Sequence, residues 1–131
     1  MSDPIATVDI APLQRGEGWR LGWDPLRGTF PALVGTEDWA LELTQAEFED
    51  FCRLSQQLAS TLGAMAAELM DEERICCEVE SDRVWVEAEG FPQHYELRLM
   101  LLTGRRGEGQ WSAIAVPPFL QALQTLAAQL L

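Results

Sequence analysis

The chain has 131 residues, about the length of one domain, and 47% of them are apolar, so it can fold around a single core. Nine basic residues against 21 acidic ones give a net charge of −12, and every one of the nine is an arginine. The lack of lysine excludes a lysine Schiff base and a P-loop, and the negative charge disfavours non-specific binding to a nucleic-acid backbone.

The three cysteines, two of them adjacent, do not form the even set of a disulfide framework. They are typical of a protein in a reducing compartment. The first ten residues carry two aspartates and no basic residue, which is unlike a secretory signal. No apolar run approaches the ~20 residues that span a bilayer. We therefore expect a cytoplasmic protein without a membrane segment.

The first part of the chain predicts an arm and three strands. Residues 1–16 hold two prolines and no sustained period, so we expect a loose arm or an edge segment there. A single domain follows over residues 17–131. Large apolar residues alternate with small or polar ones from Trp19 to Trp23, from Phe30 to Val34 and from Trp39 to Leu43, which is the spacing of strands.

A helix that begins after Thr44 has the clearest local signals. Thr44 can cap the helix, and Glu47 three residues later completes a capping box. An apolar stripe follows at spacings of three and four residues: Phe48, Phe51, Leu54, Leu58, Leu62, Met65 and Leu69. We expect the helix to end near Met70. We also expect Glu47→Ala to cost less stability than Thr44→Ala, since the partner of Glu47 in the box is a backbone amide nearer solvent.

The rest of the chain again predicts strands followed by a helix. Alternation indicates a hairpin that turns at Ser81-Asp82, a strand over residues 95–101, a Gly-rich hairpin loop over 103–109 and a strand over 110–115. Pro117-Pro118 suits the first turn of a last helix. The fold class is therefore α+β, with antiparallel β-meanders packed against two amphipathic helices. The sequence is compatible both with a duplicated unit of strands followed by a helix and with two unrelated halves.

The order of these elements resembles the Whirly fold of single-stranded-DNA-binding transcriptional regulators, in which two meanders each lead into a helix. The runs Gly18–Asp24, Trp39–Phe51 and Gly107–Trp111 are similar to a narrower family, the cyanobacterial domain of unknown function 1818. This resemblance implies a fold and a cyanobacterial cytoplasm, and it implies no activity. The DNA-binding relatives use basic and aromatic residues on the sheet, and the acidic chain departs from that pattern.

Trp85 differs from Trp19, Trp39 and Trp111, because its neighbours in strand register are charged. Trp19, Trp39 and Trp111 share parity with apolar residues, which favours a place between sheet and helix. Trp85 could instead stack a base. The arginines that could accompany such stacking are Arg20, Arg83 and Arg98.

Arg105 and Arg106 form the only concentrated positive charge in the sequence. Within their Gly-rich loop they could receive a phosphate or a carboxylate. The competing interpretation is a solvated hairpin tip that the glycines keep flexible.

Four glutamates are expected on one face of the hairpin that turns at Ser81-Asp82: Glu78, Glu80, Glu87 and Glu89. They could bind a divalent cation, or present a negative patch to a basic partner. They could equally form the solvated outer face of an amphipathic sheet.

Metal binding and catalysis find little support in the residue types. His94 is the sole histidine, and Cys76 and Cys77 would point to opposite faces of a strand, so these residues make a poor ligand set. No combination of nucleophile, base and orienting group can be assembled. We expect no cofactor, no metal and no enzymatic activity.

We interpret the protein as an interaction or regulatory protein that acts through protein contacts. The alternative is a single-stranded nucleic-acid-binding transcriptional regulator, which the fold resemblance favours and the charge opposes. We also expect a homodimer. Leu120, Ala127 and Leu131 extend the apolar surface of the last helix beyond what one small domain covers, and a second subunit would cover it.

Overall fold

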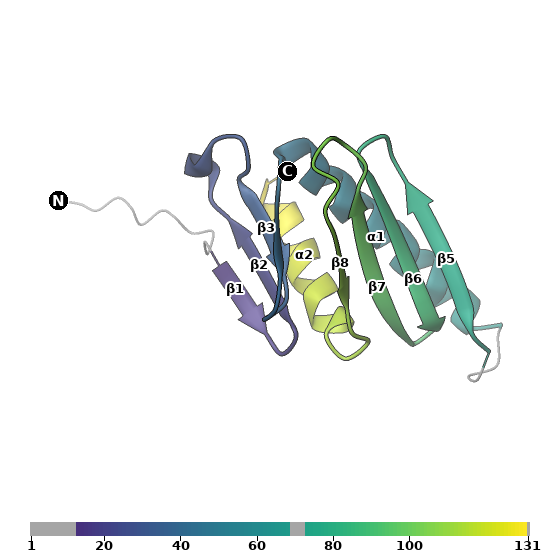
Figure 1. Ribbon diagram of the computed structural model, residues 1–131. Coiled ribbons are helices and arrows are strands. Elements are labelled where there is room, and N and C mark those ends of the chain that lie inside the picture. Colours follow the sequence, from purple (N-terminus) through teal and green to yellow (C-terminus); the bar gives the residue numbers. More distant parts are fainter. Residues whose placement is uncertain (1–12, 69–72, 131) are drawn as a thin grey trace.

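The structure is a computed structural model that describes residues 13–68 and 73–130. Within these ranges eight strands and two α-helices form two units, each of four strands followed by a helix (Figure 1). The first unit contains β1 (Leu13–Gly16), β2 (Trp19–Trp23), the short 3₁₀ helix η2 (Pro25–Arg27), β3 (Ala32–Gly35), β4 (Ala40–Leu43) and α1 (Gln45–Ala66). The second contains β5 (Ile75–Glu80), β6 (Val84–Phe91), β7 (His94–Leu101), β8 (Glu108–Trp111) and α2 (Val116–Leu130). The α+β class is confirmed.

Each unit forms its own antiparallel meander, with strand orders β1-β2-β3-β4 and β5-β6-β7-β8. Both helices lie on the same side of the two sheets (Figure 1). The helices are exchanged between the units, since α1 packs against β5 and β6 while α2 packs chiefly against β2. Each helix thus buries its apolar stripe under the meander of the other unit, and this joins the two units through one core.

Aromatic rings fill the core where the two units meet. Trp111 is fully buried and stacks between Phe51 of α1 and Phe119 of α2, with ring centroids 5.7 and 4.5 Å away. The half-buried Trp39 meets Trp111 edge-on at 4.9 Å, and the buried Trp19 lies 6.0 Å from Phe119. Strand alternation placed Trp19, Trp39 and Trp111 between sheet and helix, and all three pack in or against the core there.

The two sheets approach each other where β4 lies beside β8. The Trp39 ring occupies the place that a side chain on Gly109 would take, and Leu41 does the same for Gly107. The indole N–H of Trp111 donates to the carbonyl of Gly35 at 2.9 Å. The glycines before and within β8 therefore permit close contact between the sheets, in addition to any role in the loop.

Helix α1 begins as its sequence predicts. The Thr44 hydroxyl accepts from the Glu47 amide at 3.1 Å, and the Glu47 carboxylate accepts from the Thr44 amide at 2.9 Å, which completes the capping box. The helix ends at Ala66 instead of near Met70, a residue outside the described ranges. Leu62 is the last fully buried residue of the stripe, so further turns would have little core to cover.

Two other sequence boundaries differ from the structure. The strand expected over residues 110–115 ends at Trp111, because the amides of Ala115 and Val116 donate to the carbonyl of Ser112 and form the turn into α2. Within the expected arm, Leu13–Gly16 pairs with β2 as the edge strand β1, and residues 1–12 lie outside the described ranges. In the described part of the chain, no helix is long and apolar enough to cross a bilayer.

The apolar side of α2 is better covered than the sequence predicts. Leu120, expected to extend an exposed apolar surface, is only 9% exposed within the single chain, so that expectation is wrong. Ala127 and Leu130 are half-buried and line a groove of about 580 Å³ between α1 and α2, together with Phe48 and Cys52. Leu131 lies outside the described residues.

Candidate functional site

The sheet of β5–β8 has one face that neither helix covers, and this outer face is acidic. The strand register sets Glu78 opposite Glu87, and Glu87 opposite Arg98. All six glutamates of these strands point outward, while the alternate residues face the helices. We call this surface the acidic face; its carboxylates are Glu78, Glu80, Glu87, Glu89, Glu96 and Glu108. The four glutamates that the sequence placed together do share one face.

Trp85 lies among these carboxylates and is held on two sides. Its indole N–H donates to Glu78 at 3.0 Å, and the Arg98 guanidinium lies 5.6 Å from the ring centroid. Arg98 in turn pairs with Glu87 at 3.7 Å and with Glu108 at 3.3 Å. The ring is half-buried on the open face and is not part of the core. The arrangement fixes one flat apolar ring within an acidic surface.

The remaining groups on the acidic face leave it negative. Arg74 pairs with Glu89 at 3.4 Å, so among the residues that the structure describes, six carboxylates on this face meet only two guanidinium groups, those of Arg74 and Arg98. The Cys76 thiol donates to Glu87 at 3.3 Å, and this hydrogen bond, with the adjacent negative charges, raises the pKa of Cys76. A raised pKa disfavours the thiolate, so this exposed cysteine is a weak nucleophile.

The expected pair of free arginines at 105 and 106 does not form. Arg105 pairs with the carboxylate of Glu47, donates to the carbonyl of Glu42 at 2.6 Å and lies 4.4 Å from the ring centroid of Phe30. Arg106 is exposed and takes a left-handed conformation with φ 54°. The Gly-rich loop is thus attached to the start of α1. Neither interpretation of the sequence, an anion site or a flexible hairpin tip, predicted this contact.

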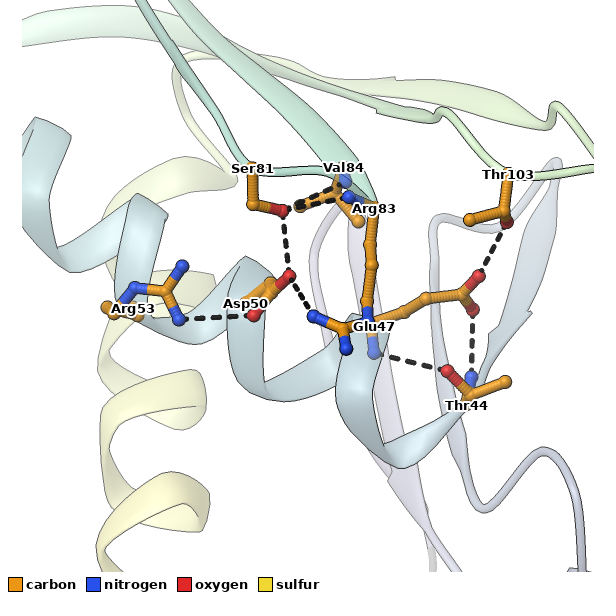
Figure 2. Close-up of polar contacts among 8 residues, drawn as sticks. All are labelled: Thr44, Glu47, Asp50, Arg53, Ser81, Arg83, Val84 and Thr103. Atoms are coloured by element: carbon orange, nitrogen blue, oxygen red, sulfur yellow. Dashed lines mark hydrogen bonds and ion pairs between the residues drawn. The ribbon is translucent and has the colours of Figure 1, made fainter.

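Arg83 is also separated from Trp85, because it lies in the turn before β6 and reaches toward α1. Its guanidinium donates to Asp50 at 3.3 Å, and Ser81 Oγ donates to the same carboxylate at 2.7 Å (Figure 2). Arg53 donates to the other oxygen of Asp50 at 3.1 Å. Arg83 therefore lies beside Asp50 of α1 and not beside the Trp85 ring.

Two buried carboxylates one turn apart, Glu47 and Asp50, connect α1 to two hairpin loops of the second sheet (Figure 2). Glu47 accepts from Thr103 at 3.0 Å and pairs with Arg105. Burial alone would raise the pKa of Asp50, but hydrogen bonds from Ser81, Arg53 and Arg83 outweigh it and lower the pKa. Sequence reasoning identified Glu47 as a cap and missed Asp50, since no local pattern shows which loops they meet.

The described residues contain no group of three or more His, Cys, Asp or Glu side chains placed to hold a metal ion. His94 is exposed at one end of β7. Burial raises the pKa of the Cys52 thiol to about 12, aided by Glu49. Cys52 is therefore protonated at neutral pH, like a structural cysteine.

The fold and the site define an α+β protein of two meander–helix units with exchanged helices and an open acidic face. The chain belongs to the DUF1818 family, described as a domain of unknown function, which matches residues 14–126. Among solved structures it is similar to a protein from Prochlorococcus sp. NATL2A, described as having unknown function and as a member of the DUF155 family. The two are 27% identical with a TM-score of 0.82, over 87% of this chain and 97% of that chain. No curated protein matches significantly.

Proposed function

We propose that this protein is a non-enzymatic interaction protein, and that it binds a basic partner protein through the acidic face. The observation that carries the proposal is the half-buried ring of Trp85, held by Glu78 and Arg98 within a surface of six carboxylates. An aromatic residue surrounded by polar groups is the composition of a binding hot spot and its rim. A cationic side chain could pack on the ring while its neighbours meet the carboxylates.

The net charge supports a cationic partner. A chain of charge −12 attracts positively charged molecules over distances set by the ionic strength, with a Debye length of ~8 Å at physiological salt. Charge complementarity of this kind raises the association rate more than it raises the affinity. We therefore expect the interaction to weaken as salt is added.

Affinity capture with paired variants tests the proposal. The double variant Glu80→Gln/Trp85→Ala removes one charge and the ring from the acidic face, and Glu17→Gln removes one charge from the exposed β1–β2 turn as a control. From a lysate of an organism that carries the family, we expect wild type and Glu17→Gln to retain the same basic protein. The double variant and high salt should release it. Capture that the double variant leaves intact would contradict the proposal.

The alternative function, single-strand nucleic-acid binding, follows from the Whirly-like order of elements and is opposed by the arrangement of arginines. Six of the nine arginines pair with carboxylates in the described structure: Arg27, Arg53, Arg74, Arg83, Arg98 and Arg105. Cations scattered among carboxylates do not build the positive groove that follows a phosphate backbone. We expect no submicromolar binding of a labelled oligonucleotide at about 0.15 M salt; tight, salt-sensitive binding would favour the alternative.

We further propose that the protein resides in a reducing cytoplasm. Cys52, Cys76 and Cys77 are all free thiols. The exposed Cys76 would be open to oxidative pairing in a compartment that forms disulfides. Cell fractionation with antibody detection tests this location.

A further inference from the structure

Strand β5 forms an open edge of the second sheet. The strand order is β5-β6-β7-β8, so β5 pairs with β6 on one side, and no strand in the described part of the chain pairs with its other side (Figure 1). At the opposite end of the sheet, β8 lies beside β4. The second sheet is therefore open to a further strand at β5.

The hairpin register shows which backbone groups of β5 face this open edge. The Ser81 amide donates to the carbonyl of Val84 at 2.9 Å, and the antiparallel register continues from there along the whole of β5. Hydrogen-bonded and non-bonded pairs alternate along an antiparallel ladder, so every second residue counted back from Ser81 bonds to β6. The residues between them point their amides and carbonyls to the open edge: Cys76, Glu78 and Glu80.

Strand β5 lacks the features that usually protect an edge from pairing. It has six residues, and its register with β6 is unbroken from Ile75 to Glu80, so no β-bulge interrupts it. Its sequence contains no proline, and the side chains on the helix-covered side, Ile75, Cys77 and Val79, are apolar and pack in or against the core. Natural edges are usually blocked by prolines, bulges or inward-pointing charges. The backbone of β5 is thus able to pair with another strand.

The two faces of β5 specify the side chains of a strand that pairs with it. On the outer face, Glu78 and Glu80 are exposed, and Glu87 of β6 lies opposite Glu78. On the helix-covered side, Cys77 and Val79 are half-buried against the core. Directly opposite residues of neighbouring strands share a face, where opposite charges attract and apolar side chains pack. A matching strand therefore alternates between cationic and apolar residues.

We propose that β5 binds an extended segment of the basic partner as an additional strand, with cationic and apolar side chains in alternation. The inference rests on the proposed function, since it states how the basic partner meets the acidic face. Glu78 connects the two parts of this surface, because its backbone faces the open edge and its carboxylate accepts from Trp85. Backbone hydrogen bonds then supply affinity, and the alternation of side chains supplies specificity.

Fluorescence anisotropy with three labelled peptides tests the proposal. The first is Lys-Val-Lys-Val-Lys-Val-Lys, whose charge opposes self-assembly. The second has the same composition without alternation, Lys-Lys-Val-Val-Val-Lys-Lys. The third is the first peptide with N-methyl groups on its three central amides, which removes donors from both of its edges. We expect saturable binding of the first peptide, weaker binding of the second, and binding about tenfold weaker for the third, the effect of losing backbone hydrogen bonds.

Variants at Cys76 test the same edge from the side of the protein. Cys76→Pro removes one edge-facing amide without changing a carboxylate, and Cys76→Ser is its matched control. Proline is tolerated in an edge strand where the N–H points away from the sheet, and thermal denaturation verifies that both variants fold. We expect Cys76→Pro to bind the first peptide about fivefold more weakly and Cys76→Ser to bind it like wild type.

Amide hydrogen exchange of the wild-type protein reports strand addition directly. The amides of Glu78 and Glu80 face the open edge, so we expect their exchange to slow when the first peptide is bound. Unchanged exchange at both amides, or equal binding of the first peptide and its methylated form, would overturn the proposal.

Two further results separate this inference from neighbouring ones. If methylation has no effect while Glu80→Gln/Trp85→Ala releases the peptide, the acidic face binds cations without strand pairing; the proposed function then stands and strand addition fails. If Cys76→Pro lowers the mass of the protein alone in light scattering, the edge pairs with a second copy of the chain, which also overturns the proposal. We expect the mass to be the same in Cys76→Pro and Cys76→Ser.

Discussion

Single residues at the start of α1 hold the second sheet in place. Glu47 and Asp50 are 4% and 6% exposed, and each joins the helix to a different hairpin loop. A buried carboxylate is stable only when it is paired and hydrogen-bonded, and both of these are. The first helical turn therefore combines a local cap with contacts to residues far along the chain.

The contacts of Thr44 and Glu47 reverse the order expected from the sequence. Glu47→Ala should destabilise the protein more than Thr44→Ala does. Thr44→Ala should cost about 0.5–2 kcal/mol, because a first-turn amide loses its acceptor. Glu47→Ala should cost about 2–3 kcal/mol or more, because Thr103 and Arg105 also lose a charged partner. Glu49→Ala on the exposed side of α1 is the control and should be close to neutral. Urea denaturation measures all three, and a smaller effect at Glu47 than at Thr44 would contradict the role of the buried carboxylate.

The lowered pKa of Asp50 predicts that the protein loses stability in acid. Its pKa in the folded state lies below the ordinary 3.8, so its ionised form contributes stability above that pH, and the contribution is lost as the pH falls through the folded pKa. Asp50→Asn should be less stable at neutral pH and should lose less stability between about pH 5 and pH 2. Ser81→Ala, which removes one of the bonds that lower the pKa, should act in the same direction more weakly. Unfolding free energies across this range check the prediction; an unchanged profile in Asp50→Asn would exclude Asp50 as its source.

At the scale of elements, the contact between β4 and β8 depends on glycine. The Trp39 ring lies against the backbone of Gly109, and the same ring meets Trp111 edge-on. A methyl group at residue 109 would displace the ring and disturb the aromatic cluster beneath it. The Gly-rich composition of the loop thus has a packing reason at this position.

Gly109→Ala should destabilise the protein by about 1–3 kcal/mol, the usual cost of forcing extra volume into a packed site. Gly104→Ala is a matched control in the same loop, since a side chain there would meet nothing within 4 Å. Thermal denaturation gives the stabilities, and tryptophan fluorescence reports displacement of Trp39. Equal stability of the two variants would mean that the sheets can separate at this contact without cost.

At the scale of the whole molecule, the exchanged helices leave an apolar groove between α1 and α2. Phe48, Cys52, Ala127 and Leu130 contribute its apolar lining. Leu120 does not support a dimer, because it is buried within the single chain. The partly exposed apolar lining of this groove supports one instead. A second copy that packs across α2 would cover it, and two-fold pairing is the most frequent arrangement of homo-oligomers.

We expect light scattering at micromolar concentration to give a mass near twice the 14.6 kDa of one chain. Leu130→Asp places a charge in the groove and should shift the mass toward the monomer, while Gln129→Asp, on the exposed side of α2, should not. A mass of one chain at every concentration would exclude the homodimer.

The sequence by itself determined the elements whose signals are local. Thr44 and Glu47 predicted the start of α1, because a capping box involves residues three apart. Alternation predicted the strands and the four glutamates on one face, because successive side chains of a strand point to opposite sides. Boundaries were less secure: Ala113 and Ala115 continue the alternation of β8, but backbone hydrogen bonds to Ser112 turn the chain toward α2.

The tertiary structure decided which helix covers which sheet, and which charges are free. Arg105 and Glu47 are 58 residues apart, and no local pattern indicates that they pair. The same holds for Asp50 with Ser81, and for the Trp39 ring on Gly109. These contacts depend on how the two units pack together around their exchanged helices, because the burial of apolar surface between units sets which distant polar groups meet. Local periodicity carries no information about that arrangement.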